Sequence, residues 1–81
     1  MPSLAFELDQ LRVADRHIAA AERRITALGE ELRAQRQLGR DVSSGSQVLE
    51  ALLEGLVVFR RHRRLIADTV EDLRSGQLRD C

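Results

Sequence analysis

The strongest constraint on the fold is a regular pattern of apolar residues in the second half of the chain. Between residues 49 and 73 they recur at alternating steps of three and four, which keeps their side chains on one side of an α-helix. The pattern predicts a helix over about residues 44–74, with Gly76 as the glycine that stops it. We call its positions the seam of this helix, and Arg63 is the one charged residue among them. They are Leu49, Leu52, Leu56, Phe59, Arg63, Ile66, Val70 and Leu73.

The first half of the chain has a similar but less regular pattern. The serine before it, Ser3, can accept a backbone N–H of a first helical turn through its hydroxyl. Gly39 can adopt the left-handed conformation that ends a helix. These features predict a helix over about residues 4–38. Its large apolar residues recur at steps of three, four or seven and are Leu4, Leu8, Leu11, Ile18, Ile25, Leu28 and Leu32.

Residues 39–46 are rich in glycine and serine and predict the turn between the two helices. Ser44 and Gln47 fit a capping box, and Ser43 would serve nearly as well as the N-cap. A linker this short makes the helices antiparallel neighbours. The sequence therefore predicts an all-α fold, an antiparallel two-helix hairpin that forms a single domain over residues 1–81. Residues 75–81 are expected to be a flexible C-terminal tail.

The two apolar patterns can be paired to predict the contacts between the helices. The expected register allows a shift of up to one heptad. Because each helix would be about 45–50 Å long, the hairpin should be a rod. The predicted pairs are Leu32 with Leu49, Gly29 with Leu52, Ile25 with Leu56, and Leu11 with Val70.

The size of the chain favours self-association. A domain of 81 residues buries only ~60% of the surface of its unfolded chain, and the single cysteine, Cys81, excludes an intrachain disulfide. Small domains without disulfides often gain stability by oligomerising, so a homodimeric four-helix bundle is expected. Apolar residues outside the seam would form its interface. The candidate dimer face is Val13, Ala20, Ala27, Leu53 and Val57.

Charged residues occur where the helical pattern expects apolar ones. Asp15 and Glu22 are in the first helix, and Arg63 is in the second. In the expected register Arg63 lies within about a turn of both carboxylates, so the three predict a buried ion pair that sets the register. The alternative is a catalytic carboxylate pair that acts on a small molecule in a pocket between the helices.

The densest charge cluster is the run from Arg60 to Arg64. Together with arginines of the first helix it could form a cationic belt that contacts nucleic-acid phosphates. The formal net charge of zero and the absence of Tyr and Trp, which stack on unpaired bases, favour a solvated helix face instead. The candidate belt is Arg16, Arg23, Arg24, Arg60, Arg61 and Arg64.

Motifs for catalysis, metals and cofactors are absent from the sequence. His17 and His62 lack the glutamate three residues earlier that helical-bundle metal sites use, since Ala14 and Phe59 occupy those positions. No metal, cofactor or catalytic residue is therefore assigned. The sequence favours a non-enzymatic protein-protein interaction or assembly module that acts as a homodimeric bundle. A nucleic-acid-binding regulatory protein that uses the arginine belt is the alternative.

The sequence also predicts a cytoplasmic location. The N-terminal residues have no cationic start, and Glu7 interrupts their apolar run, which is not the pattern of a signal peptide. The longest uncharged apolar run, Gly55 to Phe59, is far shorter than the ~18 residues that a membrane span requires. A lone thiol at Cys81 suits a reducing compartment.

Three short segments resemble a group of small, uncharacterised bacterial helical-hairpin proteins. They are Asp15-Arg-His-Ile18, Glu22-Arg-Arg-Ile25 and His62-Arg-x-x-Ile66, and the likeness covers about residues 8–73. The resemblance implies a helical hairpin and no particular activity. In architecture the chain is also similar to the plasmid repressor-of-primer proteins, two-helix hairpins that dimerise and bind RNA, although no functional residue matches between them.

Overall fold

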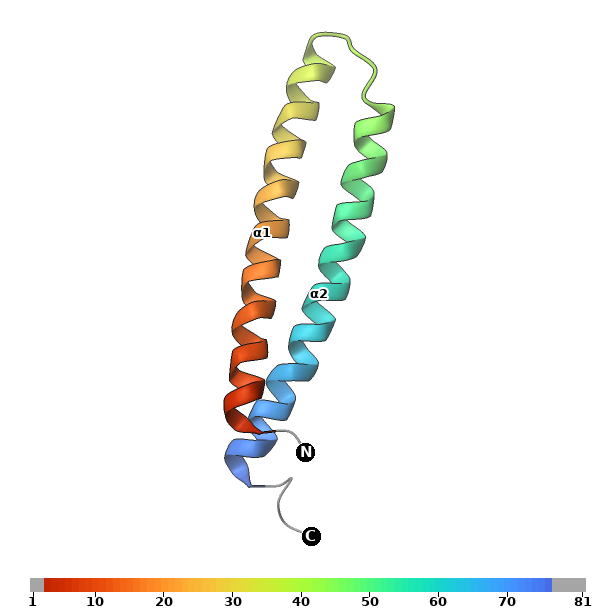
Figure 1. The fold of residues 1–81 in the computed structure, drawn as a ribbon. Helices are drawn as coiled ribbons and strands as arrows, with labels where there is room; N and C mark the ends of the chain where they lie inside the picture. The colour runs from red at the N-terminus through yellow and green to blue at the C-terminus, as the bar shows by residue number, and fades with distance from the viewer. Residues whose placement is uncertain (1–2, 77–81) are drawn as a thin grey trace.

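The computed structural model describes residues 3–76, which form two antiparallel α-helices joined by a short turn (Figure 1). Helix α1 covers Leu4–Gln37 and helix α2 covers Ser43–Ser75. No strand occurs in this range, so the predicted all-α hairpin is confirmed. The molecule is a rod that measures 63 × 16 × 15 Å. Residues 77–81, which make up most of the predicted tail and include Cys81, lie outside the described residues.

Both ends of α1 are capped as the sequence predicts. The Ser3 hydroxyl accepts a hydrogen bond from the Phe6 N–H at 3.2 Å. At the other end Gly39 has φ +76°, and the N–H of Arg40 donates to the carbonyl of Gln35 at 3.0 Å. This is the 6→1 bond of a Schellman motif, which needs a residue with positive φ at the glycine position. The helix therefore stops where a residue without a Cβ is available.

The start of α2 differs from the prediction. The helix begins at Ser43, and its N-cap residue Val42 makes no side-chain cap. Instead the Asp41 carboxylate accepts hydrogen bonds from the Ser43 N–H at 2.9 Å and from the Ser43 hydroxyl at 2.6 Å. The predicted capping role of Ser44 is wrong, because Asp41 already satisfies the first backbone donor one residue earlier. The predicted stop at Gly76, with φ +80°, is confirmed.

The core runs along the line of contact between the two helices. On α2 it follows the predicted seam, in which Leu56, Ile66 and Val70 are buried. On α1 the buried positions are Ala14, Ala21 and Leu32. Among the described residues no side chain is completely buried, because two helices alone cannot enclose one.

The position of the α1 seam corrects the sequence interpretation. It passes through Ala14 and Ala21 rather than through the charged residues next to them, and Leu4 and Leu8 are exposed. Alanine is apolar and allows helices to approach closely, so it suits a seam as well as leucine does where the helices are close. The α1 seam therefore has the same alternating steps as that of α2. It consists of Leu11, Ala14, Ile18, Ala21, Ile25, Leu28 and Leu32.

The register of the hairpin is shifted from the predicted Leu32–Leu49 pair within the allowed heptad, while Leu11 packs against the cluster that includes its predicted partner Val70. A Cβ added at Gly45 would overlap the Cδ2 atom of Leu32, so Leu32 packs beside Gly45, about one turn before Leu49. Farther along the rod His17 lies against Phe59. The absence of a side chain at Gly45 lets the start of α2 come close to α1, and this close approach fits the shift of about one helical turn.

Candidate functional site

Two ion pairs join the helices within the described range. The Arg63 Nε atom lies 2.5 Å from Asp15 Oδ1, and the Arg60 Nη2 atom lies 2.8 Å from Glu22 Oε2. The four side chains are 41% to 59% exposed, so the prediction of a buried pair is wrong in its burial. Glu22 also pairs with Arg60 rather than with Arg63. The reason is that Ala14 and Ala21 occupy the α1 seam, which leaves both carboxylates at its edge.

These ion pairs define one side of the hairpin, which we call the charged flank. Asp15 directly follows the seam residue Ala14, Glu22 follows Ala21, and Arg60 follows Phe59. Successive residues are turned by about 100° around a helix, so the residue after such a seam position and the residue before it lie on opposite sides. The residues that precede these seam positions therefore lie on the other side of the hairpin.

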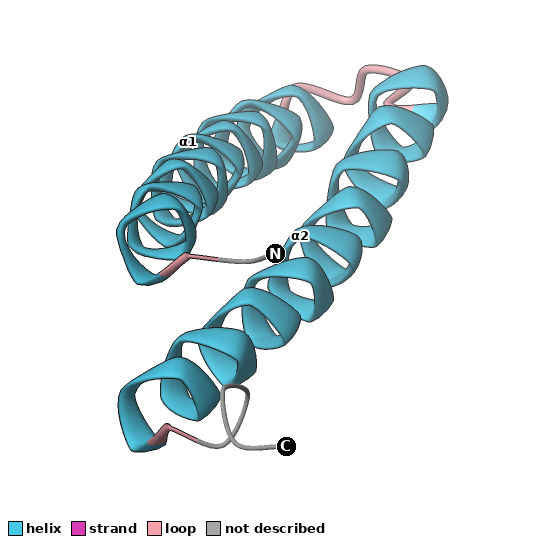
Figure 2. Ribbon diagram, turned by 60° about the horizontal axis from the view of Figure 1, so that its bottom comes forward, coloured by secondary structure: helices cyan, strands magenta, loops and turns pink. Residues whose placement is uncertain are grey.

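The other side carries fewer charged residues and two stripes of apolar ones, and we call it the apolar flank. Its defining residues precede the seam positions of the two helices: Val13, Ala20 and Ala27 on α1, and Val58 and Leu65 on α2. Val58 and Leu65 are exposed. In the oblique view of Figure 2 the two helices lie beside each other, and no other element of the described range covers either flank.

A shallow hollow between the helices lies on the apolar flank. It is lined by His17, Ala20, Ala21, Arg24 and Phe59. The rings of His17 and Phe59 form its edge, with centroids 5.8 Å apart and planes tilted by 41°. Such tilted contacts between rings are favourable, but they leave much of the Phe59 ring in water. The hollow is therefore lined by small and aromatic groups, with one charged side chain.

The predicted dimer face is not a single surface. Val13, Ala20 and Ala27 belong to the apolar flank. Leu53 and Val57 lie seven and three residues before Arg60, so they share its side of α2 and belong to the charged flank. One partner surface cannot cover both sides of the rod at once. The predicted face leaves out Val58 and Leu65, although their position directly before a seam residue would have indicated the flank.

The predicted arginine belt is also divided. Arg60, Arg61 and Arg64 line one hollow on α2 together with Val57. Arg24 lies in the hollow of the apolar flank, on the opposite side of the rod. Arg16 and Arg23 are seven residues apart, so they share one side of α1. Each lies two residues after a seam position, which places it on the outer side of the helix, away from α2. The six arginines therefore form no continuous belt.

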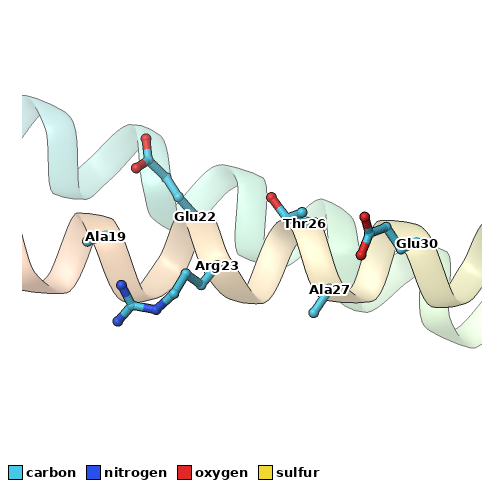
Figure 3. A pocket seen from close by; sticks show the side chains of 6 residues that line it. All are labelled: Ala19, Glu22, Arg23, Thr26, Ala27 and Glu30. Atoms are coloured by element: carbon cyan, nitrogen blue, oxygen red, sulfur yellow. The ribbon is translucent and has the colours of Figure 1, made fainter.

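The hollow that contains Arg23 is formed by α1 alone. Figure 3 shows Glu22, Thr26 and Glu30 along one side of it and Arg23 and Ala27 along the other. The hollow therefore carries charges of both signs. Residues 3–76 contain no group of three or more His, Cys, Asp or Glu side chains that could hold a metal ion. Within the same range, neither helix has a stretch long and apolar enough to cross a membrane.

Comparisons of the chain with protein-family models, with curated proteins and with solved structures found no match. The resemblance to bacterial helical-hairpin proteins therefore stays a prediction. The arrangement of the two flanks is the remaining guide to function.

Proposed function

We propose that this protein is a non-enzymatic interaction or assembly module that works as a homodimeric four-helix bundle. The observation that carries the proposal is the amount of surface that a single hairpin leaves in water. Its accessible surface is 6369 Å² for a mass of 9.2 kDa. A compact protein of this mass exposes about 4,900 Å², so the hairpin exposes roughly 1,500 Å² more than expected.

The shape of the molecule supports the same proposal. The radius of gyration is 18.2 Å, whereas a compact chain of this length would have about 12 Å. Ten large apolar residues are exposed within the described range, and a second hairpin could remove part of their surface from water. The exposed large apolar residues are Leu4, Phe6, Leu8, Leu38, Val48, Leu53, Val57, Val58, Phe59 and Leu65.

The carboxylates of the hairpin favour a structural role over catalysis. Asp15 and Glu22 are each half-exposed and each paired with an arginine. Catalytic carboxylates are commonly desolvated or placed beside a like charge, which is how their proton affinity is tuned. The hollows near these residues are open on the helix surface, so they provide little enclosure for a small molecule. A rigid rod that presents surfaces to partners is the function that this geometry favours.

Light scattering coupled to size-exclusion chromatography tests the proposal. At tens of micromolar we expect a mass of about twice the 9.2 kDa of one chain. The melting temperature should also rise with protein concentration, because dissociation and unfolding are coupled in a small dimer. A single-chain mass at these concentrations, with a melting temperature independent of concentration, would contradict the proposal.

A second candidate function is nucleic-acid binding by the arginine cluster of α2. The observation that favours it is that Arg60, Arg61 and Arg64 line one hollow. Phosphate contacts by these residues would make binding to RNA or duplex DNA fall steeply with salt. Replacing all three by alanine should then abolish binding, whereas Arg16→Ala with Arg23→Ala, on the outer part of α1, should not. Affinity that is unchanged in the triple variant would remove this candidate.

A further inference from the structure

We infer that the partner of the apolar flank is the apolar flank of a second copy of this chain, and that α2 of each copy packs on α1 of the other. This inference rests on the proposed function, because it specifies the surface through which the homodimer forms. The charged flank then stays in water. The surface differs from the face expected from the sequence, since it excludes Leu53 and Val57.

The two stripes of the apolar flank have complementary sizes. The stripe on α1 contains the small side chains of Ala20 and Ala27, whereas the stripe on α2 contains the larger side chains of Val58 and Leu65. Both stripes repeat every seven residues, so the large side chains of one can enter the spaces above the small side chains of the other. Because α1 and α2 are on the same chain, a two-fold axis provides this fit twice. The hairpin is therefore complementary to itself.

The heights of these residues along the rod agree with such an arrangement. A two-fold axis parallel to the rod leaves every height unchanged. The contacts of Asp15 with Arg63 and of His17 with Phe59 place Ala20 level with residues 56–58 of α2. Val58 of the second copy would therefore lie within about a turn of Ala20. The same geometry puts the Leu65 side chain of the second copy near Val13.

The contrast in charge between the flanks favours the same choice. Covering the charged flank would remove two ion pairs and the neighbouring Arg64 from water, and such desolvation opposes association. Of the residues that precede a seam position, three are charged, namely Arg24, Glu31 and Asp72, whereas nine of the residues that follow one are charged. A stable dimer interface removes about 800 Å² from each partner. An interface of that size would remove about half of the roughly 1,500 Å² by which the hairpin exceeds a compact protein.

Two adjacent valines allow a matched experiment. Val57 is 54% exposed and lies on the charged flank, and Val58 is 58% exposed and lies on the apolar flank. In Val58→Glu each dimer would bury two carboxylates, so the dimer dissociation constant should rise by at least about a hundredfold. In Val57→Glu the new carboxylate stays in water near Arg61, and the dissociation constant should change less than about threefold. Analytical ultracentrifugation of the full chain measures both constants.

A second pair of variants controls for the possibility that a substitution unfolds the helix locally. Leu65→Glu on the apolar flank and Leu53→Glu on the charged flank repeat the comparison, with helix content checked by circular dichroism. Loss of the dimer in Val58→Glu and Leu65→Glu alone supports the inference. Equal effects on both flanks, or a larger effect of Val57→Glu and Leu53→Glu, would overturn it while leaving a homodimer intact as the function. A wild-type chain that is monomeric would instead overturn the proposed function.

Discussion

The charged flank and the apolar flank are formed by the same two helices and the same seam, yet they are chemically opposite. After the seam residues Ala14, Ala21 and Phe59 come Asp15, Glu22 and Arg60, whose side chains join the helices through ion pairs that remain half-exposed. Before the same seam residues come Val13, Ala20 and Val58, of which Val13 is partly buried and the other two are exposed. Ion pairs therefore link the two helices on one side of the rod, which also exposes Leu53 and Val57, whereas the other side exposes Val58 and Leu65.

The residues beneath both flanks should have the largest effect on stability. Ile66 is buried and packs with Ala14 and Val70. Ile66→Ala should lower the free energy of unfolding by about 2–4 kcal/mol, because it leaves a cavity in a core that has few other contacts. Thermal melts followed by circular dichroism measure this. The control is Leu65→Ala, one residue earlier on the apolar flank, whose effect should depend on protein concentration. Equal melting temperatures for Ile66→Ala and the wild type would contradict the described core.

Two glycines compare the flanks without introducing charge. Gly29 follows the seam residue Leu28 on the charged flank, and Gly55 precedes Leu56 on the apolar flank. A Cβ added at either meets no atom within 4 Å in the single hairpin, so alanine should stabilise each helix by about 0.5–1 kcal/mol.

The two glycine variants should diverge as the protein concentration rises. Gly29→Ala should keep its full gain, whereas Gly55→Ala should lose part of it, because the added methyl group enters the contact with the second copy. Chemical denaturation at a low and a high protein concentration measures both gains. Equal gains at all concentrations would remove the distinction between the flanks.

Breaking the ion pairs of the charged flank should have a smaller effect. Asp15→Asn and Glu22→Gln each remove one carboxylate that is about half-exposed. Each should cost less than about 1 kcal/mol, and the cost should fade in ~1 M salt, where charges are screened within about 3 Å. Urea unfolding at low and high salt tests this, and the dimer mass should not change. A loss of the dimer in either variant would show that the charged flank takes part in the interface.

The smallest effect is expected at the turn, which belongs to neither flank. Hydrogen bonds from the Ser43 hydroxyl and from its N–H hold the pKa of the Asp41 carboxyl below its ordinary value. Since the pKa is lower in the folded chain, these bonds stabilise the fold above the unfolded-state pKa and are lost as the pH falls through the folded-state pKa.

A substitution at Asp41 tests the contribution of the turn. Asp41→Ala should melt slightly below the wild type near neutral pH, and the difference should disappear in strong acid, where the wild-type carboxyl is protonated. Melting curves collected across this pH range, with Ser44→Ala as the control, measure the effect. If Ser44→Ala instead reproduced it, the capping box expected from the sequence would be correct after all.

Much of the fold could be predicted from local patterns. The α2 seam, the Ser3 cap and the glycine stops follow from interactions within a few residues, which a sequence displays directly. The α1 seam could not be placed in this way. Ala14 and Asp15 are neighbours around the helix, and leucine and isoleucine spacing alone leaves both as possible seam positions. Only the packing of α2 against this helix distinguishes them.

The candidate site shows the same limit. The sequence identified Asp15, Glu22 and the arginines as partners, but pairing Glu22 with Arg60 depends on the register. The register places Leu32 beside Gly45, a contact between distant residues that no local pattern measures. The expected dimer face was divided for another reason: three of its residues precede seam positions and two follow them, which depends on the side of α1 that faces α2.

By itself, the sequence determined that this protein forms two long helices joined by a tight turn, because helix periodicity, capping and left-handed glycines are local properties. The tertiary structure decided which side of α1 faces α2, how far the helices slide past each other, and therefore which residues remain in water. These choices depend on side-chain volume at the contact between the helices. Small residues at Ala14, Ala21 and Gly45 allow the close approach that separates an ion-paired flank from an apolar one.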